Sequence, residues 1–152
     1  MSAPLRSPYG IDLLHGSLWQ GGKPEARLAD DAREFDTLVL CAYEVQFAGE
    51  RVPGLRIIRC PMDDATLSNE EAAAALSAAE AVVAELKRGR RVLCTCHQGR
   101  NRSGLVSAMA LVGTYGMRPS QAIRLIQSRR KNALENPSFT HFLLGPERAG
   151  RL

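Results

Sequence analysis

The sequence has few aromatic residues and no long apolar run. Aromatic side chains make up 5% of the 152 residues, and Trp19 is the only tryptophan. No apolar run reaches the roughly 20 residues that a membrane-spanning helix needs. Residues 1–10 contain no apolar segment of the kind found in secretory signals. We therefore expect a protein without a membrane span, located in the cytoplasm.

Cysteine is also scarce. The four cysteines (Cys41, Cys60, Cys94 and Cys96) are too few and too irregularly spaced for a disulfide framework. Cys94 and Cys96, followed by His97, lack the spacing of zinc ligands, and no second ligand pair lies nearby. We expect neither a metal site nor a cofactor.

Lysine is rare, and the positive charge comes almost entirely from arginine. Lys and Arg together number 20 against 16 acidic residues, which gives a formal net charge of +4. A mild positive field favours anionic substrates. The excess is too small to indicate nucleic-acid binding, so we expect no nucleic-acid partner.

The most informative stretch is residues 90–104, which read RRVLCTCHQGRNRSG. Its first half predicts a strand at residues 92–95, and its end predicts the start of a helix at Arg102. Backbone N–H groups curled in the turn between them would form a cradle for an anion at the helix N-terminus. Gly99 permits a backbone conformation closed to other residues. Arg102 can offer a planar fork to two phosphate oxygens.

Cys96 lies at the centre of this expected positive field. A free cysteine has a pKa of about 8.5, which helix N-termini and nearby cations lower. A thiolate under a bound phosphoryl group is a nucleophile aimed at phosphorus. A lone cysteine at a strand end is more often a small buried hydrophobe. The combination with Arg102 in a strand–loop–helix context favours the reactive interpretation.

Residues 96–103, which read CHQGRNRS, resemble the C-x5-R-S/T signature of the cysteine-based protein phosphatases. In length and layout the chain is similar to a compact dual-specificity phosphatase. The resemblance implies a phosphocysteine intermediate on Cys96, and a Ser103 hydroxyl that helps the sulfur leave. It also implies a phosphate-binding loop made of His97, Gln98, Gly99, Arg100, Asn101 and Arg102. The family usually has histidine directly before the nucleophile, where this chain has Thr95.

Phosphoester cleavage also needs a proton for the leaving oxygen, and a positioned acid contributes about 10²–10⁴-fold. Asp64 is our candidate, because it lies on a loop leaving a strand that we expect beside the Cys96 strand. Family members carry their acid at a similar separation, and the Pro61-x-x-Asp64 frame resembles theirs. Asp63 is the alternative. Either aspartate on its own would more simply solvate a turn.

Cys41 ends a continuous apolar strand at residues 37–41. A buried strand-end thiol is the simpler interpretation. Resemblance to relatives with a cysteine at this point implies that Cys41 is a candidate redox partner of Cys96, able to trap it in a reversible disulfide.

The remaining pattern alternates strands with helices. We predict further strands at 17–20 and 55–60, and helices at 25–33, 69–87 and 103–115, from Pro119, and from Pro137 to about Gly145-Pro146. Residues 68–71, SNEE, form a capping box at the start of the helix at 69–87. In that helix, periodicity places Leu76, Ala79, Val83 and Leu86 on the buried face.

In the helix from Pro119, Arg130 is expected to point outward. Asn136 is either the N-cap of the last helix, or, as the resemblance implies, a residue near the phosphate loop. The order of elements predicts a single α/β domain with a central, mostly parallel sheet flanked by helices. The resemblance implies the dual-specificity phosphatase fold over residues 1–152, with 1–10 and 146–152 as loose termini.

The resulting functional hypothesis is a monomeric phosphomonoester hydrolase acting on phosphotyrosine proteins, with phosphoserine and phosphothreonine as further substrates. Three alternatives stay open. The GRNRSG run resembles RNA 5′-triphosphatases of the same chemistry, although those typically lack the acid. Arg100 leaves a phosphoinositide phosphatase open. Thr95 encourages a catalytically weak pseudophosphatase that binds phosphorylated partners.

Overall fold

The computed structural model describes residues 9–24, 34–46 and 53–148. Its strands are β1 (Ile11–His15), β2 (Leu18–Gly21), β3 (Thr37–Ala42), β4 (Arg56–Met62) and β5 (Val92–Thr95). Its helices are α1 (Asn69–Lys87), α2 (Arg102–Tyr115), α3 (Pro119–Arg129) and α4 (Pro137–Arg148). The predicted helix at 25–33 lies outside the described residues.

The sheet has the strand order β1-β2-β5-β3-β4. Only β1 runs antiparallel, pairing with β2, while β2, β5, β3 and β4 are mutually parallel. The predicted α/β fold with a mostly parallel sheet is confirmed. Two details differ. The sequence did not indicate β1, an edge strand of mixed exposure, and β4 lies beside β3 instead of β5.

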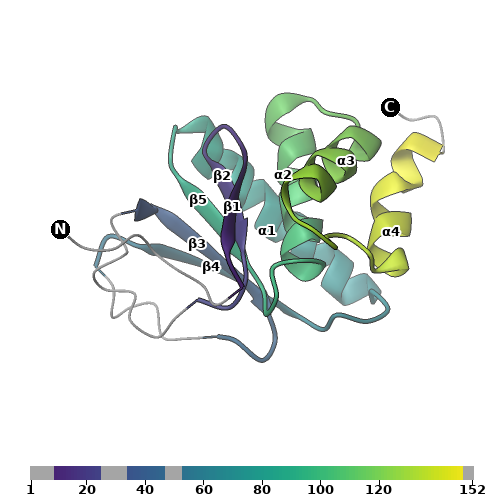
Figure 1. Ribbon diagram of the computed structural model, residues 1–152, viewed down its shortest axis with the longest axis horizontal. Coiled ribbons are helices and arrows are strands. Elements are labelled where there is room, and N and C mark those ends of the chain that lie inside the picture. Colours follow the sequence, from purple (N-terminus) through teal and green to yellow (C-terminus); the bar gives the residue numbers. More distant parts are fainter. Residues whose placement is uncertain (1–8, 25–33, 47–52, 149–152) are drawn as a thin grey trace.

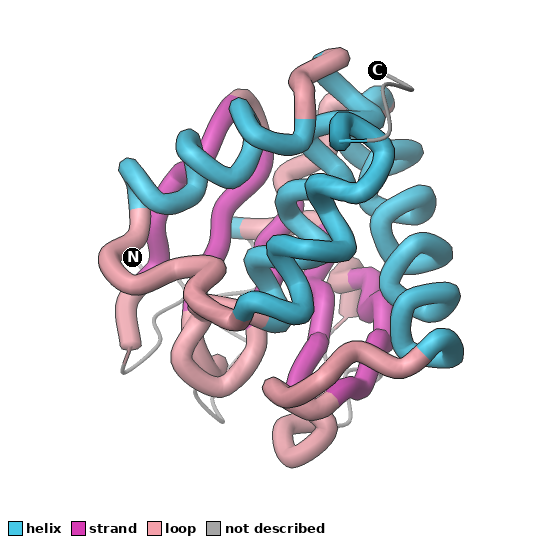
Figure 2. Tube along the Cα trace, turned by 90° about the vertical axis from the view of Figure 1, so that its right-hand side faces the viewer, coloured by secondary structure: helices cyan, strands magenta, loops and turns pink. Residues whose placement is uncertain are grey.

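The described helices gather on one side of the sheet, to the right of and behind the strands in Figure 1. Figure 2 turns that side toward the viewer, with helices in front of strands. One core cluster fills the space between them and includes Leu14, Val39, Ala79, Leu105 and Phe139. A second cluster, built around Leu38, Leu40 and Leu93, lies on the opposite face. There Trp19 is half-buried and meets Phe35 edge-on, with ring centroids 5.4 Å apart.

Helix α1 begins and ends where the sequence predicted. The capping box is formed, with Glu71 N donating to Ser68 Oγ and Ser68 N donating to the Glu71 carboxylate. Its predicted buried face was partly wrong, because Leu76 is 47% exposed. The buried face is made largely of small residues, Ala75, Ala78 and Ala79, together with Val82. Small side chains allow close approach of α1 to its neighbours, and hydrophobic periodicity alone ranks a leucine above them.

Two further expectations at the C-terminal end were wrong. Helix α4 continues through Pro146 to Arg148 instead of ending at Gly145-Pro146. The proline removes a single helical hydrogen bond, the one that a backbone N–H at this position would donate to Phe142 O. Arg130 is only 6% exposed and does not point into solvent. No helix in the described part of the chain is both long and apolar enough to span a membrane.

Candidate active site

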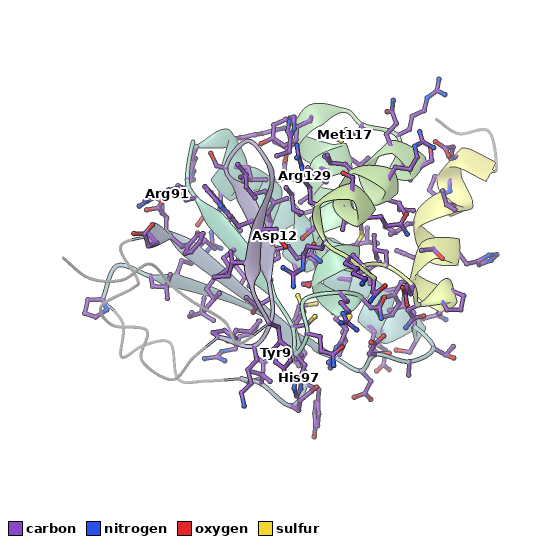
Figure 3. All side chains as sticks on the ribbon, in the orientation of Figure 1. Tyr9, Asp12, Arg91, His97, Met117 and Arg129 are labelled. Carbon is purple, nitrogen blue, oxygen red and sulfur yellow. The ribbon has the colours of Figure 1, made fainter. Side chains whose placement is uncertain are left out.

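The loop at residues 96–101 joins β5 to α2 at the carboxyl edge of the parallel strands. Figure 3 shows His97 and Tyr9 together at the lower end of the sheet, while Arg91, just before β5, lies at the opposite end. A cavity of about 330 Å³ opens over this loop. Its lining residues are Glu44, Asp64, Cys96, His97, Gln98, Arg100, Asn101, Arg102, Asn132 and Glu135.

The carbonyl groups of residues 97–101 all point away from the cavity toward donors outside the loop. Those donors are Lys23 N to His97 O, Arg130 Nη2 to Gln98 O, Arg130 Nε and Gln20 Nε2 to Gly99 O, Leu134 N to Arg100 O, and Leu105 N to Asn101 O, at 2.6 to 3.2 Å. The N–H groups of residues 97–101 form no hydrogen bond with any described residue. The loop therefore presents a set of free donors, the arrangement that binds anions.

Gly99 is required at the middle of this loop for two reasons. Its φ of +70° belongs to the left-handed region that side-chained residues rarely adopt. A Cβ atom at this position would collide with the carbonyl group of Gly21. The loop is thus pressed against the end of β2, and no larger residue fits there.

Cys96 lies beneath the loop and is 4% exposed. Its Sγ is 3.3 Å from Ser103 Oγ, the pairing that the resemblance implied. Thr95, in place of the usual histidine, is buried and donates to Val39 O at 2.7 Å. Its hydroxyl therefore ties the base of the loop to β3.

Arg102 is held by Glu44 through one end of its guanidinium group. Nη1 and Nη2 donate to the two Glu44 carboxylate oxygens at 2.6 and 2.8 Å, and Nη1 also donates to Met62 O at 3.1 Å. Nε is buried and has no hydrogen-bond partner among the described residues. Because Glu44 occupies the Nη1–Nη2 end, the Nε–Nη2 edge remains as a second fork.

Sequence reasoning did not connect Glu44 with Arg102. Hydrogen bonds from Arg102 lower the pKa of Glu44 to about 2, so it is ionised throughout the neutral range. The same carboxylate lies 3.3 Å from His97 Nδ1, and His97 Nε2 lies 3.2 Å from the Tyr9 hydroxyl. The available signal was position, because polar residues just after buried parallel strands gather at the carboxyl edge of a sheet.

Asp64 lines the cavity, whereas the alternative, Asp63, does not. Asp64 Oδ2 accepts a hydrogen bond from Asn101 Nδ2 at 2.9 Å, and Oδ1 accepts one from Asn136 Nδ2 at 2.8 Å. Asp63 is exposed, and its N–H donates to Glu71 at the start of α1. The structure thus brings Asp64 to the loop, although β4 is one strand further from β5 than expected.

Comparison with known proteins agrees with this geometry. The family model described as "Dual specificity phosphatase, catalytic domain" matches residues 18–149. The chain belongs to the dual specificity phosphatase family. No curated protein matches the sequence.

Solved structures show the same dual specificity phosphatase fold. Human DUSP28 is 24% identical, with a TM-score of 0.76 over 99% of this chain and 100% of that chain. Tk-PTP in the active form is 24% identical, with a TM-score of 0.77 over 93% of this chain and 97% of that chain. PTPMT1 in complex with PI(5)P is 18% identical, with a TM-score of 0.73 over 93% and 97% of the two chains.

Arg130 is the second residue of this phosphatase domain that sequence reasoning missed. It donates to the carbonyl groups of Gly99 at 2.6 Å and Gln98 at 3.1 Å, and it pairs with Asp12 at 2.7 Å. It also donates to the Tyr9, Gly10 and Gln20 carbonyls. Arg130 directly follows α3, where helical periodicity no longer predicts direction.

The four cysteines of the phosphatase domain are all free and buried. Cys41, Cys60 and Cys94 share one core cluster with Cys96. Burial raises the pKa of Cys60 to about 11 and of Cys94 to about 12, and it raises that of Cys41 well above its usual range. These three remain thiols at neutral pH. The predicted pairing of Cys41 with Cys96 stays a prediction.

Proposed function

We propose that the protein hydrolyses phosphomonoesters, phosphotyrosine first, through a phosphocysteine on Cys96. The observation that supports this best is the donor set around the sulfur. The N–H groups of residues 97–101 and the buried Nε of Arg102 lack acceptors among the described residues. A buried donor such as Arg102 Nε is rarely left unpaired in folded proteins. A phosphate group would supply acceptors to all of them at once.

In the first step the Cys96 thiolate attacks phosphorus, the S–P bond forms and the ester P–O bond breaks. The loop N–H groups and the Nε–Nη2 edge of Arg102 position the transferring phosphoryl group and stabilise the charge spread over its equatorial oxygens. Protonated Asp64 gives its proton to the leaving oxygen, which departs as a neutral alcohol or phenol.

In the second step water attacks the phosphocysteine. Asp64, now a carboxylate, accepts a proton from that water, and the S–P bond breaks to give inorganic phosphate and the free thiolate. Ser103 Oγ, 3.3 Å from the sulfur, donates a hydrogen bond to the departing thiolate. Every group in this scheme comes from one chain, so the mechanism needs no second copy.

The proposed substrate is a phosphorylated protein in the cytoplasm. Asp64 at the cavity supports acid-assisted cleavage of monoesters over the triphosphatase alternative, which needs no such acid. The fold shared with PTPMT1, crystallised with PI(5)P, makes a phosphoinositide the next substrate to test. A matched panel therefore holds a phosphotyrosine peptide, a phosphoserine peptide, a phosphoinositide and a 5′-triphosphate RNA.

The deciding experiment is hydrolysis of p-nitrophenyl phosphate against pH by wild type, Cys96→Ser and Asp64→Asn, with Asp63→Asn as control. We expect Cys96→Ser to be inactive. Asp64→Asn should lose about 10²-fold or more and its basic limb, because a positioned acid contributes about 10²–10⁴-fold. Asp63→Asn should behave as wild type.

Other results have defined meanings. A near-neutral Asp64→Asn variant would remove Asp64 as the acid and revive the triphosphatase alternative. A wild type that binds inorganic phosphate but hydrolyses nothing in the panel would make the protein a phosphate-binding module.

A further inference from the structure

We propose that a groove beside the active-site cavity is a substrate subsite, in which Glu135 selects a basic side chain next to the phosphorylated residue of a protein substrate. The proposal rests on the proposed function and narrows its substrate class to phosphoproteins with lysine or arginine beside the phosphotyrosine. The groove has a volume of about 500 Å³. It runs between residues 64–66 and residues 135–138.

The groove opens into the cavity, because Asp64, Asn101 and Glu135 line both hollows. Arg102 lines the cavity but not the groove, and its side chain is 8% exposed. Its buried Nε has no partner among the described residues, which marks the cavity as the place of the phosphate group. A substrate chain whose phosphate is bound there can pass its neighbouring residue into the groove.

Glu135 is exposed where the two hollows meet. Its carboxylate forms no hydrogen bond or ion pair with another residue in the described part of the chain. The other acidic side chains of the cavity lining are engaged, since Glu44 pairs with Arg102 and both oxygens of Asp64 accept from amide groups. Within the described lining, Glu135 is therefore the acidic group left for an outside partner.

The backbone fixes the position from which the Glu135 side chain starts. The preceding residue, Leu134, is buried and packs against Gly104 in α2, where a Cβ atom would collide with the leucine side chain. The Leu134 N–H donates to Arg100 O on the phosphate loop at 3.2 Å. Leu134 also has a φ of +54°, in the left-handed region that side-chained residues rarely adopt. Glu135 is thereby held beside the phosphate loop.

The charge of the groove is opposite to that of the cavity floor. Among the described residues that line the groove, the ionisable side chains are Asp64 and Glu135, and none is basic. Asp64 is neutral while it acts as the acid, so Glu135 supplies the negative charge. Arg100 lines the cavity but not the groove. A substrate with an anionic phosphate and a cationic neighbour complements both regions, whereas phosphoinositides and 5′-triphosphate RNA have no cation near the reactive phosphate.

The first test measures peptide binding to Cys96→Ser, which lacks the nucleophile. The phosphotyrosine peptides carry lysine, alanine or glutamate at the residue before or the residue after the phosphotyrosine. We expect lysine to bind about threefold to fivefold more tightly than glutamate at one of these two positions, the size of an exposed ion pair. Added salt should reduce this preference, because salt screens exposed charges.

Substitutions of Glu135 in the Cys96→Ser background show whether this carboxylate is the cause. Glu135→Gln should bring the ratio of the two dissociation constants close to one, and Glu135→Lys should invert it. The ratio cancels any general change in phosphate affinity. The control Glu80→Gln removes an equal charge from an exposed site on α1 that lines neither hollow, and it should keep the original ratio.

Two binding results would overturn the subsite. The first is equal affinity for lysine and glutamate peptides at both positions, or a lysine preference that survives Glu135→Gln. The second is tighter binding of the glutamate peptides or of a soluble phosphoinositide headgroup than of any lysine peptide. That result would assign the selectivity of the cavity to Arg100.

Hydrolysis of the same peptides by wild type separates this proposal from the proposed function. We expect the lysine preference to appear in KM with similar kcat values, because the groove contacts a part of the substrate that does not react. A preference confined to kcat would make Glu135 an influence on the acid and overturn the subsite. Failure to hydrolyse any phosphotyrosine peptide would overturn the proposed function, while the binding ratios still decide the subsite.

Discussion

At the scale of single residues, Arg130, which we predicted to point into solvent, orients the backbone of the phosphate loop. Arg130 donates to the Gln98 and Gly99 carbonyls, which turns those peptide groups so that their N–H sides face the cavity. A lysine at position 130 would keep the positive charge but lack the planar guanidinium group that donates to several carbonyls at once. A buried acceptor left unsatisfied costs about 1–3 kcal/mol.

We expect Arg130→Lys to lower the free energy of unfolding by about 2 kcal/mol. It should also weaken competitive inhibition by inorganic phosphate, because the loop N–H groups are no longer held inward. Urea denaturation and inhibition measurements check the two effects. The matched control is Arg129→Lys, one residue earlier and exposed in the structure, which should change neither. Equal stability and equal phosphate inhibition in the two variants would contradict the role of Arg130 in orienting the loop.

At the scale of elements, the start of α1 also anchors the loop that carries Asp64. Glu71 accepts from Ser68 N with one carboxylate oxygen and from Asp63 N with the other, both at 3.1 Å. The N–H of Ser68, with that of Asp63, lowers the pKa of Glu71, against the opposing effect of burial. Glu71 is therefore ionised at neutral pH, so both of its oxygens can accept the hydrogen bonds from Ser68 and Asp63.

Loss of the capping hydroxyl should be a measurable local defect. We expect Ser68→Ala to lower the free energy of unfolding by about 1 kcal/mol, since N-cap serine to alanine changes cost about 0.5–2 kcal/mol. Ser77→Ala, at an exposed position within the same helix, should be neutral or slightly stabilising because alanine is the better helix former. Urea denaturation of both variants makes the comparison. A Ser68→Ala variant as stable as Ser77→Ala would contradict a working cap.

What the sequence predicted well at this scale was local. The capping box and the apolar run of β3 depend on neighbours within a few residues, and both were confirmed. The buried face of α1 and the direction of Arg130 depend on distant partners. Leu76 was predicted inward because nothing local records which face meets α2. Arg130 was predicted outward because Tyr9, Gly10 and Gln20 are remote in sequence.

At the scale of the whole molecule, Glu85 joins three elements at the end of the sheet opposite the cavity. This buried carboxylate accepts from Thr37 at the start of β3 at 2.8 Å and pairs with Arg56 at the start of β4 at 3.2 Å. Burial alone would raise its pKa, but the hydrogen bonds from Thr37 and Arg56 and the charges of Arg56 and Arg90 outweigh it, and the pKa is lowered.

A lowered folded-state pKa gives stability that is present above the unfolded-state value, about 4.3 for glutamate, and lost as the pH falls below it. We expect wild type to lose stability on acidification below about pH 4.3 more steeply than Glu85→Gln, so the two stability curves converge. Glu80→Gln, exposed on the same helix, should follow wild type. Urea denaturation over a pH series tests this. Parallel curves of stability against pH for wild type and Glu85→Gln would contradict a stabilising Glu85 carboxylate.

The candidate site shows the same division between local and distant information. Cys96, Gly99, Arg102 and Ser103 lie within eight residues of one another, and their arrangement followed from the motif. Asp64 was chosen with the help of the resemblance, and its place at the cavity was found in the structure. The pairing of Glu44 with Arg102 was missed because Arg102 lies 58 positions later in the chain. The pairing depends on β3 lying beside β5.

The contacts of Arg130 also bear on when the site exists. Its guanidinium reaches Tyr9 O, 121 positions earlier in the chain, and contacts between residues so distant in sequence slow folding because a long loop must close first. During synthesis, residues 96–103 leave the ribosome before Arg130 does. Until Arg130 follows, nothing holds the Gln98 and Gly99 carbonyls so that the loop N–H groups face the cavity. Binding of an anion is then a property of the finished molecule alone, and phosphate affinity becomes a direct reporter of complete folding.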